Sequence, residues 1–179
     1  ELKRSLELIE WLPLDHVVMH LGNPDDRFSP VLFEYAYAAI ALVRNYAGVP
    51  VMIENIPNEI STIDRILEFK SAAQVPEVGI CYDTGHGHLQ KIAEGFEHIH
   101  AMHVHDNHGD KDEHLPPAFP SETTGTIDWK AALPLLSGVP LVLELKEQPG
   151  QAEPTEATVA LAAARGGFDA LQSPADAAD

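Results

Sequence analysis

The sequence of 179 residues contains little cysteine, few basic residues and no long hydrophobic stretch. Cys81 is its only cysteine, which excludes an intramolecular disulfide and fits a reducing compartment, so we expect a cytoplasmic protein. A membrane-spanning helix needs roughly 18 or more consecutive apolar residues, and no such run is present. The sequence therefore predicts a globular protein that does not span a membrane.

Basic residues are scarce relative to acidic ones. The sequence has 11 Lys and Arg against 28 Asp and Glu, so its formal net charge is −17. A surface this negative repels phosphate backbones unless metals or a local basic patch intervene, so general nucleic-acid binding is disfavoured. Histidine, in contrast, is abundant: there are 10, and seven lie from His86 to His108. This clustering favours metal chemistry.

Short apolar runs alternate along the chain with longer segments that repeat apolar residues at helical spacing. The apolar runs are nearly continuous, which is typical of strands in a parallel sheet that is covered by helices. Ser61 or Thr62 is expected to cap one helix. We predict strands at 15–22, 49–55, 78–83, 100–106 and 139–145, helices at 30–46, 61–73, 89–97, 127–136 and 155–171, and a frayed tail from about residue 172.

Each predicted strand ends in a side chain that can bind a metal. The mean distance between successive strand-end residues is 31 residues, and eight such βα units make a TIM barrel of roughly 250 residues. We therefore predict one α/β domain over residues 1–179: an incomplete (β/α)8 TIM barrel with about five C-terminal βα units and without the N-terminal strands. The strand-end residues are His20, Glu54, Asp83, His103 and Glu144.

Three of these residues are carboxylates that follow apolar runs. Glu54 follows VPVMI, Asp83 follows VGICY and Glu144 follows VPLVL. A buried carboxylate needs a cation, an arginine or several hydrogen bonds, and three of them at one barrel mouth repel one another. Pairing with buried arginine is the alternative, but arginine is scarce here. A divalent cation relieves the repulsion directly, so the pattern favours a metal site.

Histidines near the strand ends add further candidate ligands. His103 and His105 lie two residues apart and are therefore expected on the same face of their strand. A mixture of neutral imidazole and carboxylate suits zinc, manganese, iron or cobalt. Two other pairs with metal-ligand spacing are Asp83 with His86 and Asp112 with His114.

Six motifs together resemble the superfamily of xylose isomerase-like TIM barrels, which joins sugar phosphate isomerases and epimerases with endonuclease IV. They run from about residue 16 to 146 and read VVMHLGNP, VMIENIPN, CYDTGHGHL, HVHDNHGDKDEHLPP, GTIDW and LVLEL. The most specific part is HVHDN…DEHLPP followed by GTIDW. Two features depart from the usual pattern: Ala118 replaces the glycine after HLPP, and residues 119–124 lengthen the loop before GTIDW.

The resemblance implies roles for the matching residues. His86 lies at a position that contacts substrate in the epimerases and binds metal in endonuclease IV. We also expect His105 to face the substrate. The implied core metal ligands are Glu54, Asp83, His103 and Glu144, and the residues that match further ligands of the endonuclease's trinuclear site are His20, His86, Asp112 and His114.

The first functional hypothesis is a divalent-metal-dependent isomerase or epimerase of a sugar, sugar phosphate or polyol. Glu54 and Glu144 would move a proton to and from the substrate carbon, through an enediolate that the metal stabilises. The metal would be Zn, Mn, Co, Fe or Mg. A phosphodiesterase of the endonuclease IV kind, with two or three metals, is the alternative that the additional ligands favour and the negative charge opposes.

A third hypothesis is a barrel that binds a polyol or a protein partner without turnover. A barrel with five of eight strands exposes two edges and half of its core. We therefore expect either that the missing strands were cleaved, left out or disordered, or that a second chain or a homo-oligomer covers the gap. The predicted ligand is a small carbohydrate-like molecule, with no membrane and no nucleic acid among the partners.

Overall fold

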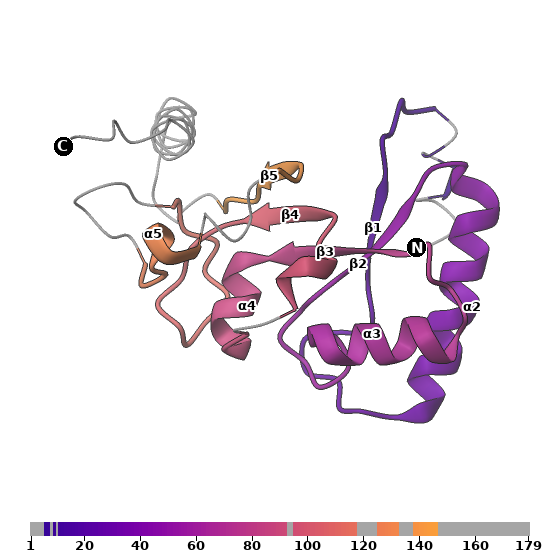
Figure 1. The fold of residues 1–179 in the computed structure, drawn as a ribbon, viewed down its shortest axis with the longest axis horizontal. Helices are drawn as coiled ribbons and strands as arrows, with labels where there is room; N and C mark the ends of the chain where they lie inside the picture. Colours follow the sequence, from indigo (N-terminus) through magenta and orange to yellow (C-terminus); the bar gives the residue numbers. More distant parts are fainter. Residues whose placement is uncertain are drawn as a thin grey trace.

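The computed structural model describes residues 6–7, 9, 11–92, 95–117, 125–132 and 138–146. Within them, five strands form one parallel sheet whose spatial order follows the chain (Figure 1). Each strand is bonded to its sequence neighbour, as in a barrel, whereas a doubly wound sheet reverses direction at a switch point. The strands are β1 (Val17–His20), β2 (Val51–Glu54), β3 (Gly79–Asp83), β4 (Ala101–Val104) and β5 (Leu141–Leu143).

Helices connect successive strands, as the alternating pattern predicts. The predictions for 30–46 and 61–73 correspond to α2 (Pro30–Ala47) and α3 (Ile63–Ala72). Thr62 is the N-cap of α3, and its hydroxyl accepts a hydrogen bond from the backbone N–H of Arg65. The described part of the predicted helix at 127–136 is α5 (Trp129–Ala132).

The helix predicted at 89–97 is displaced in the structure. The chain instead turns directly from β3 into α4 (Thr84–Gln90), and a 3-10 helix follows at Phe96–His98. The side chain of Asp83 caps α4 by accepting a hydrogen bond of 2.7 Å from the backbone N–H of His86. Two glycines made this segment a poor helix candidate, but the cap begins the helix immediately after the strand.

Side chains in the strands alternate between the interior of the half barrel and the helix layer. Met52, Cys81 and Ala101 form a small buried group on the interior side. The main core lies on the opposite face, where Ile53, Ile80 and Met102 pack under the helices. Two residues beyond the interior group, and on the same face, lie Glu54, Asp83 and His103.

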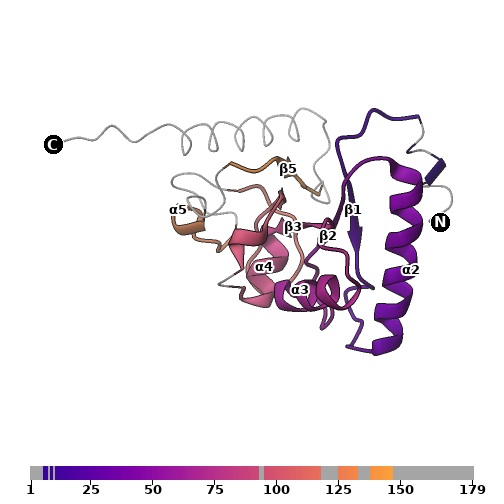
Figure 2. The same ribbon diagram turned by 45° about the vertical axis from the view of Figure 1, so that its right-hand side comes forward.

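The sheet is half of a barrel, in agreement with the sequence prediction, and β1 and β5 form its two edges. Its interior is therefore open at the β5 edge. Val142 lies on the interior side of β5 and is 45% exposed, whereas Ala101 on the interior side of β4 is 1% exposed. Figure 2 shows α2 standing beside β1 at the other edge.

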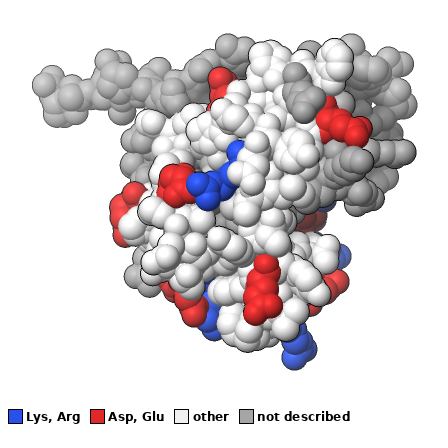
Figure 3. Space-filling model, turned by 90° about the vertical axis from the view of Figure 1, so that its right-hand side faces the viewer, with Lys and Arg blue, Asp and Glu red and all other residues white. Residues whose placement is uncertain are grey.

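The outer side of α2 carries exposed apolar side chains. Val31, Tyr35, Leu42 and Tyr46 recur there at helical spacing. Figure 3 looks onto the side of the molecule where α2 lies and shows Lys and Arg only as scattered side chains among uncharged ones. The described residues on this face therefore form no basic patch of the kind that binds nucleic acid.

Some predicted features lie outside the described residues: the helix at 155–171, the frayed tail from about 172, residues 133–136 of the preceding helix, and the longer loop at 118–124. Among the helices that the structure describes, none combines the length and apolar character needed to cross a membrane.

We expect Gly85→Ala to destabilise the protein although it lies within a helix. A Cβ atom at Gly85 would lie 1.9 Å from Cε1 of His105, so the buried ring would have to move. Overpacking of this kind costs about 1–3 kcal/mol, which exceeds the gain in helix propensity. Denaturant unfolding measures the change.

Gly48→Ala provides the matched control for this substitution. Gly48 has a left-handed φ of 63°, but no neighbouring atom lies within 4 Å of a Cβ placed there. The loss should be limited to the backbone cost of about 1–2 kcal/mol for a left-handed residue with a side chain. Equal unfolding free energies for Gly85→Ala and the unmodified protein would contradict the close packing of α4 against His105.

Candidate metal centre

Four strand-end side chains from four different strands meet on the interior side of the half barrel. Each offers one ligand atom, and these four atoms all lie within 4.8 Å of one another. We call this group the carboxylate cluster. Its members are Glu54 at the end of β2, Asp83 at the end of β3, His103 in β4 and Glu144 directly after β5.

Glu54 is the member of the carboxylate cluster that lies beside three imidazoles. Its side chain is 2% exposed, and its Oε2 lies 3.0 Å from Nδ1 of His103 and 3.2 Å from Nε2 of His20. Oε1 lies 3.3 Å from Nδ1 of His86. Burial alone would raise the pKa of Glu54, but these imidazoles lower it far below its usual range. Glu54 is therefore a carboxylate that stays ionised inside the protein.

Glu144 and His103 form the open end of the carboxylate cluster. Nδ1 of His103 lies 3.3 Å from Oε2 of Glu144, whose side chain is 46% exposed. The neighbouring His103 imidazole lowers the pKa of Glu144. Burial alone would lower the pKa of His103, but Cys81, Glu144 and Glu54 beside its ring raise it to about 12.

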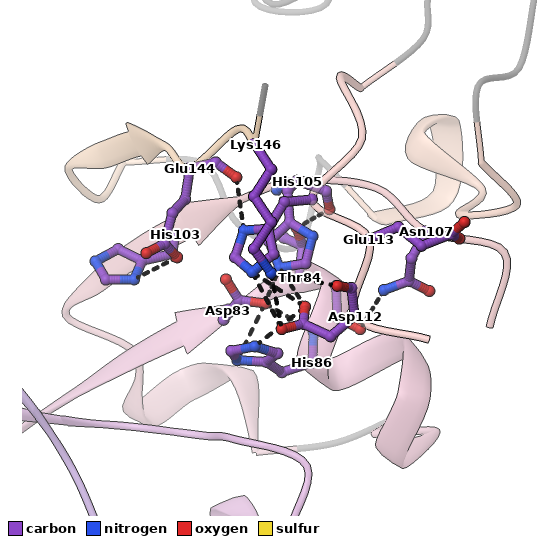
Figure 4. Close-up of polar contacts among 12 residues, drawn as sticks. Asp83, Thr84, His86, His103, His105, Asn107, Asp112, Glu113, Glu144 and Lys146 are labelled. Atoms are coloured by element: carbon purple, nitrogen blue, oxygen red, sulfur yellow. Dashed lines mark hydrogen bonds and ion pairs between the residues drawn. The ribbon is translucent and has the colours of Figure 1, made fainter. Parts of the chain in front are cut away.

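A second group of potential ligands adjoins the first. Three imidazoles and one carboxylate place one ligand atom each within 4.8 Å of all the others. We call this group the histidine cluster. Figure 4 shows several of its members gathered beside Asp83, at the start of α4. Its members are His86 in α4, His105 directly after β4, and Asp112 and His114 in the loop that follows.

The three rings of the histidine cluster share one arrangement. Nδ1 lies near a backbone carbonyl in each: 2.9 Å from Asn55 O for His86, 3.3 Å from Asp106 O for His105, and 2.9 Å from Glu144 O for His114. A carbonyl oxygen only accepts, so Nδ1 carries the hydrogen and donates it. Nε2 of every ring is thereby turned toward the cluster, which is how metal-binding histidines are held.

The Nε2 atoms converge on two carboxylates. Nε2 of His114 lies 3.1 Å from Asp112, and Nε2 of His86 lies 3.5 Å from the same carboxylate. Nε2 of His105 lies 2.9 Å from Oδ1 of Asp83, and the His105 ring stacks on the His114 ring at 3.9 Å. Asp83 belongs to the carboxylate cluster as well, so it joins the two groups.

Protonated imidazoles balance the negative charge when only protein atoms are present. Burial alone would lower the pKa of His86, but Asp112 and Glu54 raise it to about 10. Burial alone would raise the pKa of Asp112, but His114 and His86 lower it far below its usual range. A divalent cation in place of these protons would leave the histidines neutral, which is the form that binds metals.

Four buried polar atoms without hydrogen bonds bear on whether the two clusters can hold a cation. Glu54 Oε1, Asp83 Oδ2, His103 Nδ1 and His105 Nε2 make no hydrogen bond of acceptable geometry, although ion-pair partners lie near all of them except Asp83 Oδ2. Buried polar atoms without hydrogen bonds are costly, and here they point into two groups of ligand atoms. The donor sets therefore fit bound cations.

His114 adopts an unusual backbone conformation. Its φ is 54°, in the left-handed region, which costs a residue with a side chain about 1–2 kcal/mol. The conformation persists because the neighbouring Leu115 is bonded to Asp106 in both directions and because Nδ1 of His114 donates to Glu144 O. Strain of this kind is concentrated at functional sites.

The structure brings the four predicted core ligands together and divides the remaining candidates differently. His86, Asp112 and His114 meet in the histidine cluster. His20 does not join them: its side chain is 52% exposed and contacts Glu54. His105, which we expected to face the substrate, is completely buried and supplies Nε2 to the histidine cluster.

Sequence reasoning missed Asn55 as a residue that positions the site. Its side-chain oxygen accepts a hydrogen bond of 2.7 Å from Asp83 N, and its side-chain nitrogen donates to Asp83 O at 3.1 Å. This amide fastens the ends of β2 and β3 at the level of the ligands. The signal in the sequence was the polar side chain of Asn55 itself, because it directly follows Glu54 at the end of a buried strand.

One cavity in the described part of the chain lies away from both clusters. It has a volume of about 630 Å³ and is lined by Tyr82, Phe96, Ile127 and neighbouring residues of the helix layer. No member of either cluster lines it, so it does not supply the substrate pocket of this site.

The amino-acid sequence matches, over residues 1–165, the protein family described as Xylose isomerase-like TIM barrel. It is 30% identical over 149 residues to uncharacterized protein y4fM of Sinorhizobium fredii and 36% identical over 112 residues to uncharacterized protein MJ1614 of Methanocaldococcus jannaschii. These matches include 73% and 55% of this chain but only 45% and 43% of the relatives. The chain thus spans less than half the length of either relative.

Solved structures share the fold. A D-tagatose 3-epimerase-like protein superposes with a TM-score of 0.66 at 20% identity, covering 95% of this chain and 69% of that one. A xylose isomerase domain protein from Planctomyces limnophilus gives 0.65 at 18%, covering 95% and 64%. The 3-keto-D-glucoside 4-epimerase YcjR from E. coli gives 0.62 at 16%, covering 92% and 69%. These likenesses support the incomplete TIM barrel.

We predict that His86 and His103 remain protonated in the metal-free protein between about pH 6 and pH 8, where an ordinary histidine titrates. Their pKa values of about 10 and 12 lie above this range. Their ion pairs therefore stabilise the metal-free fold below the ordinary histidine pKa, and this contribution is lost as the pH rises through the raised values. NMR titration of the imidazole nitrogens measures this, and a midpoint near 6.5 for either ring would contradict the described ion pairs.

Proposed function

This chain belongs to the xylose isomerase-like TIM barrel family, and we propose that it contributes the metal-binding half of a divalent-metal-dependent isomerase or epimerase. The proposed substrate is a sugar, a sugar phosphate or a related polyol. The observation that carries the proposal is the carboxylate cluster, whose four ligand atoms from four strands lie within 4.8 Å of one another. The carboxyl ends of barrel strands are where TIM-barrel enzymes place their catalytic groups.

The donor set of the carboxylate cluster indicates the class of metal. Three carboxylates and one imidazole suit Mn, Mg, Co, Fe or Zn. When bound, the cation supplies Lewis-acid stabilisation of the negative charge that develops on substrate oxygens as a carbon-bound proton is removed. Glu54, Asp83, His103 and Glu144 would hold it, because their ligand atoms already converge.

Glu54 and Glu144 are the proposed proton-transfer residues. They approach His103 from the ends of β2 and β5, at 3.0 Å and 3.3 Å from its Nδ1. Glu54 is enclosed, whereas Glu144 is half exposed and can meet a substrate that enters from the open side. In the proposed reaction one carboxylate removes a proton from the carbon next to a carbonyl, and the other returns a proton.

The histidine cluster is proposed to bind a second cation. Its three inward Nε2 atoms and one carboxylate form a donor set richer in nitrogen, which suits Zn, Co or Fe better than Mg. This cluster is the observation that favours the alternative function, a metal-dependent phosphodiesterase of the endonuclease IV kind. The formal net charge of −17 opposes a nucleic-acid substrate.

The single buried cysteine is consistent with a reducing cytoplasm, where we place the protein. A carbohydrate-like molecule is the proposed partner at the site. We further propose that three more βα units, from the same or another polypeptide, pair with the open edge of β1 in the active assembly, because an unpaired parallel edge leaves backbone hydrogen-bonding groups unsatisfied.

We expect Glu54→Gln to abolish metal binding at the carboxylate cluster and to reduce proton exchange by at least about 100-fold. The protein, assembled with the complementary βα units, is loaded with Mn²⁺ and incubated with a panel of ketoses and inososes in D2O. Deuterium incorporation into the substrate is followed by NMR. The substitution keeps the size of the side chain and removes its charge.

Glu68→Gln is the matched control, because Glu68 lies on the surface of α3 and, among the described residues, forms its ion pair with the nearby Arg65. It should exchange deuterium at the rate of the unmodified protein. Absence of exchange with every sugar, in an assembly that binds Mn²⁺, would overturn the isomerase proposal. Cleavage of abasic-site DNA by the same assembly would establish the phosphodiesterase instead.

A further inference from the structure

We propose that Asp106 is a positioning residue that holds the histidine cluster in its ligand geometry, an inference that rests on the proposed cation binding at that cluster. Asp106 follows His105 directly, and its side chain is buried at 1% exposure. It does not belong to either group of ligand atoms. It therefore acts on the site through the segments that it holds.

The carboxylate of Asp106 accepts hydrogen bonds from three N–H groups. Oδ1 accepts from the backbone of Asn107 at 2.7 Å and from the backbone of Ile127 at 3.2 Å. Oδ2 accepts from the indole Nε1–H of Trp129 at 2.8 Å. A buried carboxylate with several N–H donors forms strong, directional bonds. Asp106 thus fastens the segment 125–129 to the end of β4.

The backbone of Asp106 closes the loop that carries two ligands. Its N–H donates to Leu115 O at 2.7 Å, and its carbonyl accepts from Leu115 N at 2.9 Å. The enclosed loop contains Asp112 and the left-handed His114, which directly precedes the bridge. The same carbonyl lies 3.3 Å from Nδ1 of His105 and orients that ring. Three of the four histidine-cluster ligands therefore depend on the placement of Asp106.

The GTIDW motif has the residues that this arrangement requires. A Cβ atom at Gly125 would lie 2.2 Å from Oδ1 of Asp106 and 2.7 Å from Asn107 O, so only glycine fits there. The backbone N–H of Thr126 donates to Asn107 O at 2.9 Å. Ile127 and Trp129 then present their donors to the carboxylate from one segment. The close fit at Gly125 and the two N–H donors of Ile127 and Trp129 thus explain the GTIDW motif as the segment that binds the Asp106 carboxylate.

The carboxylate cluster does not depend on these contacts. Glu54, Asp83 and His103 lie within β2, β3 and β4, which hold one another through parallel pairing. Glu144 follows β5, and its backbone N–H donates to Val104 O. Weaker hydrogen bonding by the Asp106 side chain should therefore lower cation affinity at the histidine cluster. Cation affinity at the carboxylate cluster should stay unchanged.

Two backgrounds of the 179-residue chain separate the clusters in the test. Glu54→Gln leaves the histidine cluster as the intact donor set, and His114→Ala leaves the carboxylate cluster. Asp106→Asn is added to each, and Co²⁺ binding is measured by equilibrium dialysis. We expect Asp106→Asn to weaken Co²⁺ binding at least about tenfold in the Glu54→Gln background and less than about twofold in the His114→Ala background, because partners that orient ligands change metal affinity by 10–100-fold.

Asp128→Asn is the control, because Asp128 is an exposed carboxylate in the same segment whose Oδ1 accepts from Ala131 N. It should leave Co²⁺ binding unchanged in both backgrounds. Trp129→Phe keeps the ring and removes one donor to Asp106, so it should weaken histidine-cluster binding by a few-fold. If circular dichroism shows that Asp106→Asn does not fold, Trp129→Phe serves as the test of the positioning role of Asp106.

Equal weakening in both backgrounds, or none in the Glu54→Gln background, would overturn the role of Asp106 while the proposed cation binding stands. If neither parent background binds Co²⁺, both proposals are overturned. A selective loss for Asp106→Asn or Trp129→Phe in the Glu54→Gln background supports the positioning role, because general destabilisation would weaken both clusters.

Discussion

The buried carboxylate of Asp83 is the group at which the two clusters and the local fold meet. Its Oδ1 caps α4 through His86 N at 2.7 Å and lies 2.9 Å from Nε2 of His105. Its Oδ2 is buried without a hydrogen bond. An uncompensated buried charge costs several kcal/mol, so this site requires positive charge, supplied either by imidazolium protons or by divalent cations. The arrangement of strand ends and loops around Asp83 follows from that requirement.

The two clusters differ in chemistry and in access. The carboxylate cluster is rich in oxygen and opens toward Glu144, whose side chain is half exposed. The histidine cluster is rich in nitrogen, and its rings are held by backbone carbonyls that orient Nε2 inward. An open oxygen-rich site suits a substrate with adjacent hydroxyl or carbonyl oxygens, and an enclosed nitrogen-rich site suits a cation that stays bound.

The half barrel and the carboxylate cluster were predictable because buried carboxylates at the ends of apolar strands stand out in a sequence. Helix α4 was misplaced because its two glycines lower helix propensity, whereas the cap by Asp83 and the packing of Gly85 against His105 are tertiary effects. The position of His105 in the histidine cluster was not predictable from the sequence either. Residue parity placed it beside His103, but β4 ends at Val104 and the chain turns there. The contact between Asp106 and Trp129 joins residues 23 positions apart and leaves no periodic signal.

Anomalous X-ray diffraction from crystals of the protein grown with Mn²⁺ tests cation binding at the carboxylate cluster directly. We expect an anomalous peak about 2.0–2.3 Å from oxygens of Glu54, Asp83 and Glu144 and from a ring nitrogen of His103. Crystals without a peak there, in which these carboxylates remain paired only with protonated histidines, would contradict cation binding at this cluster.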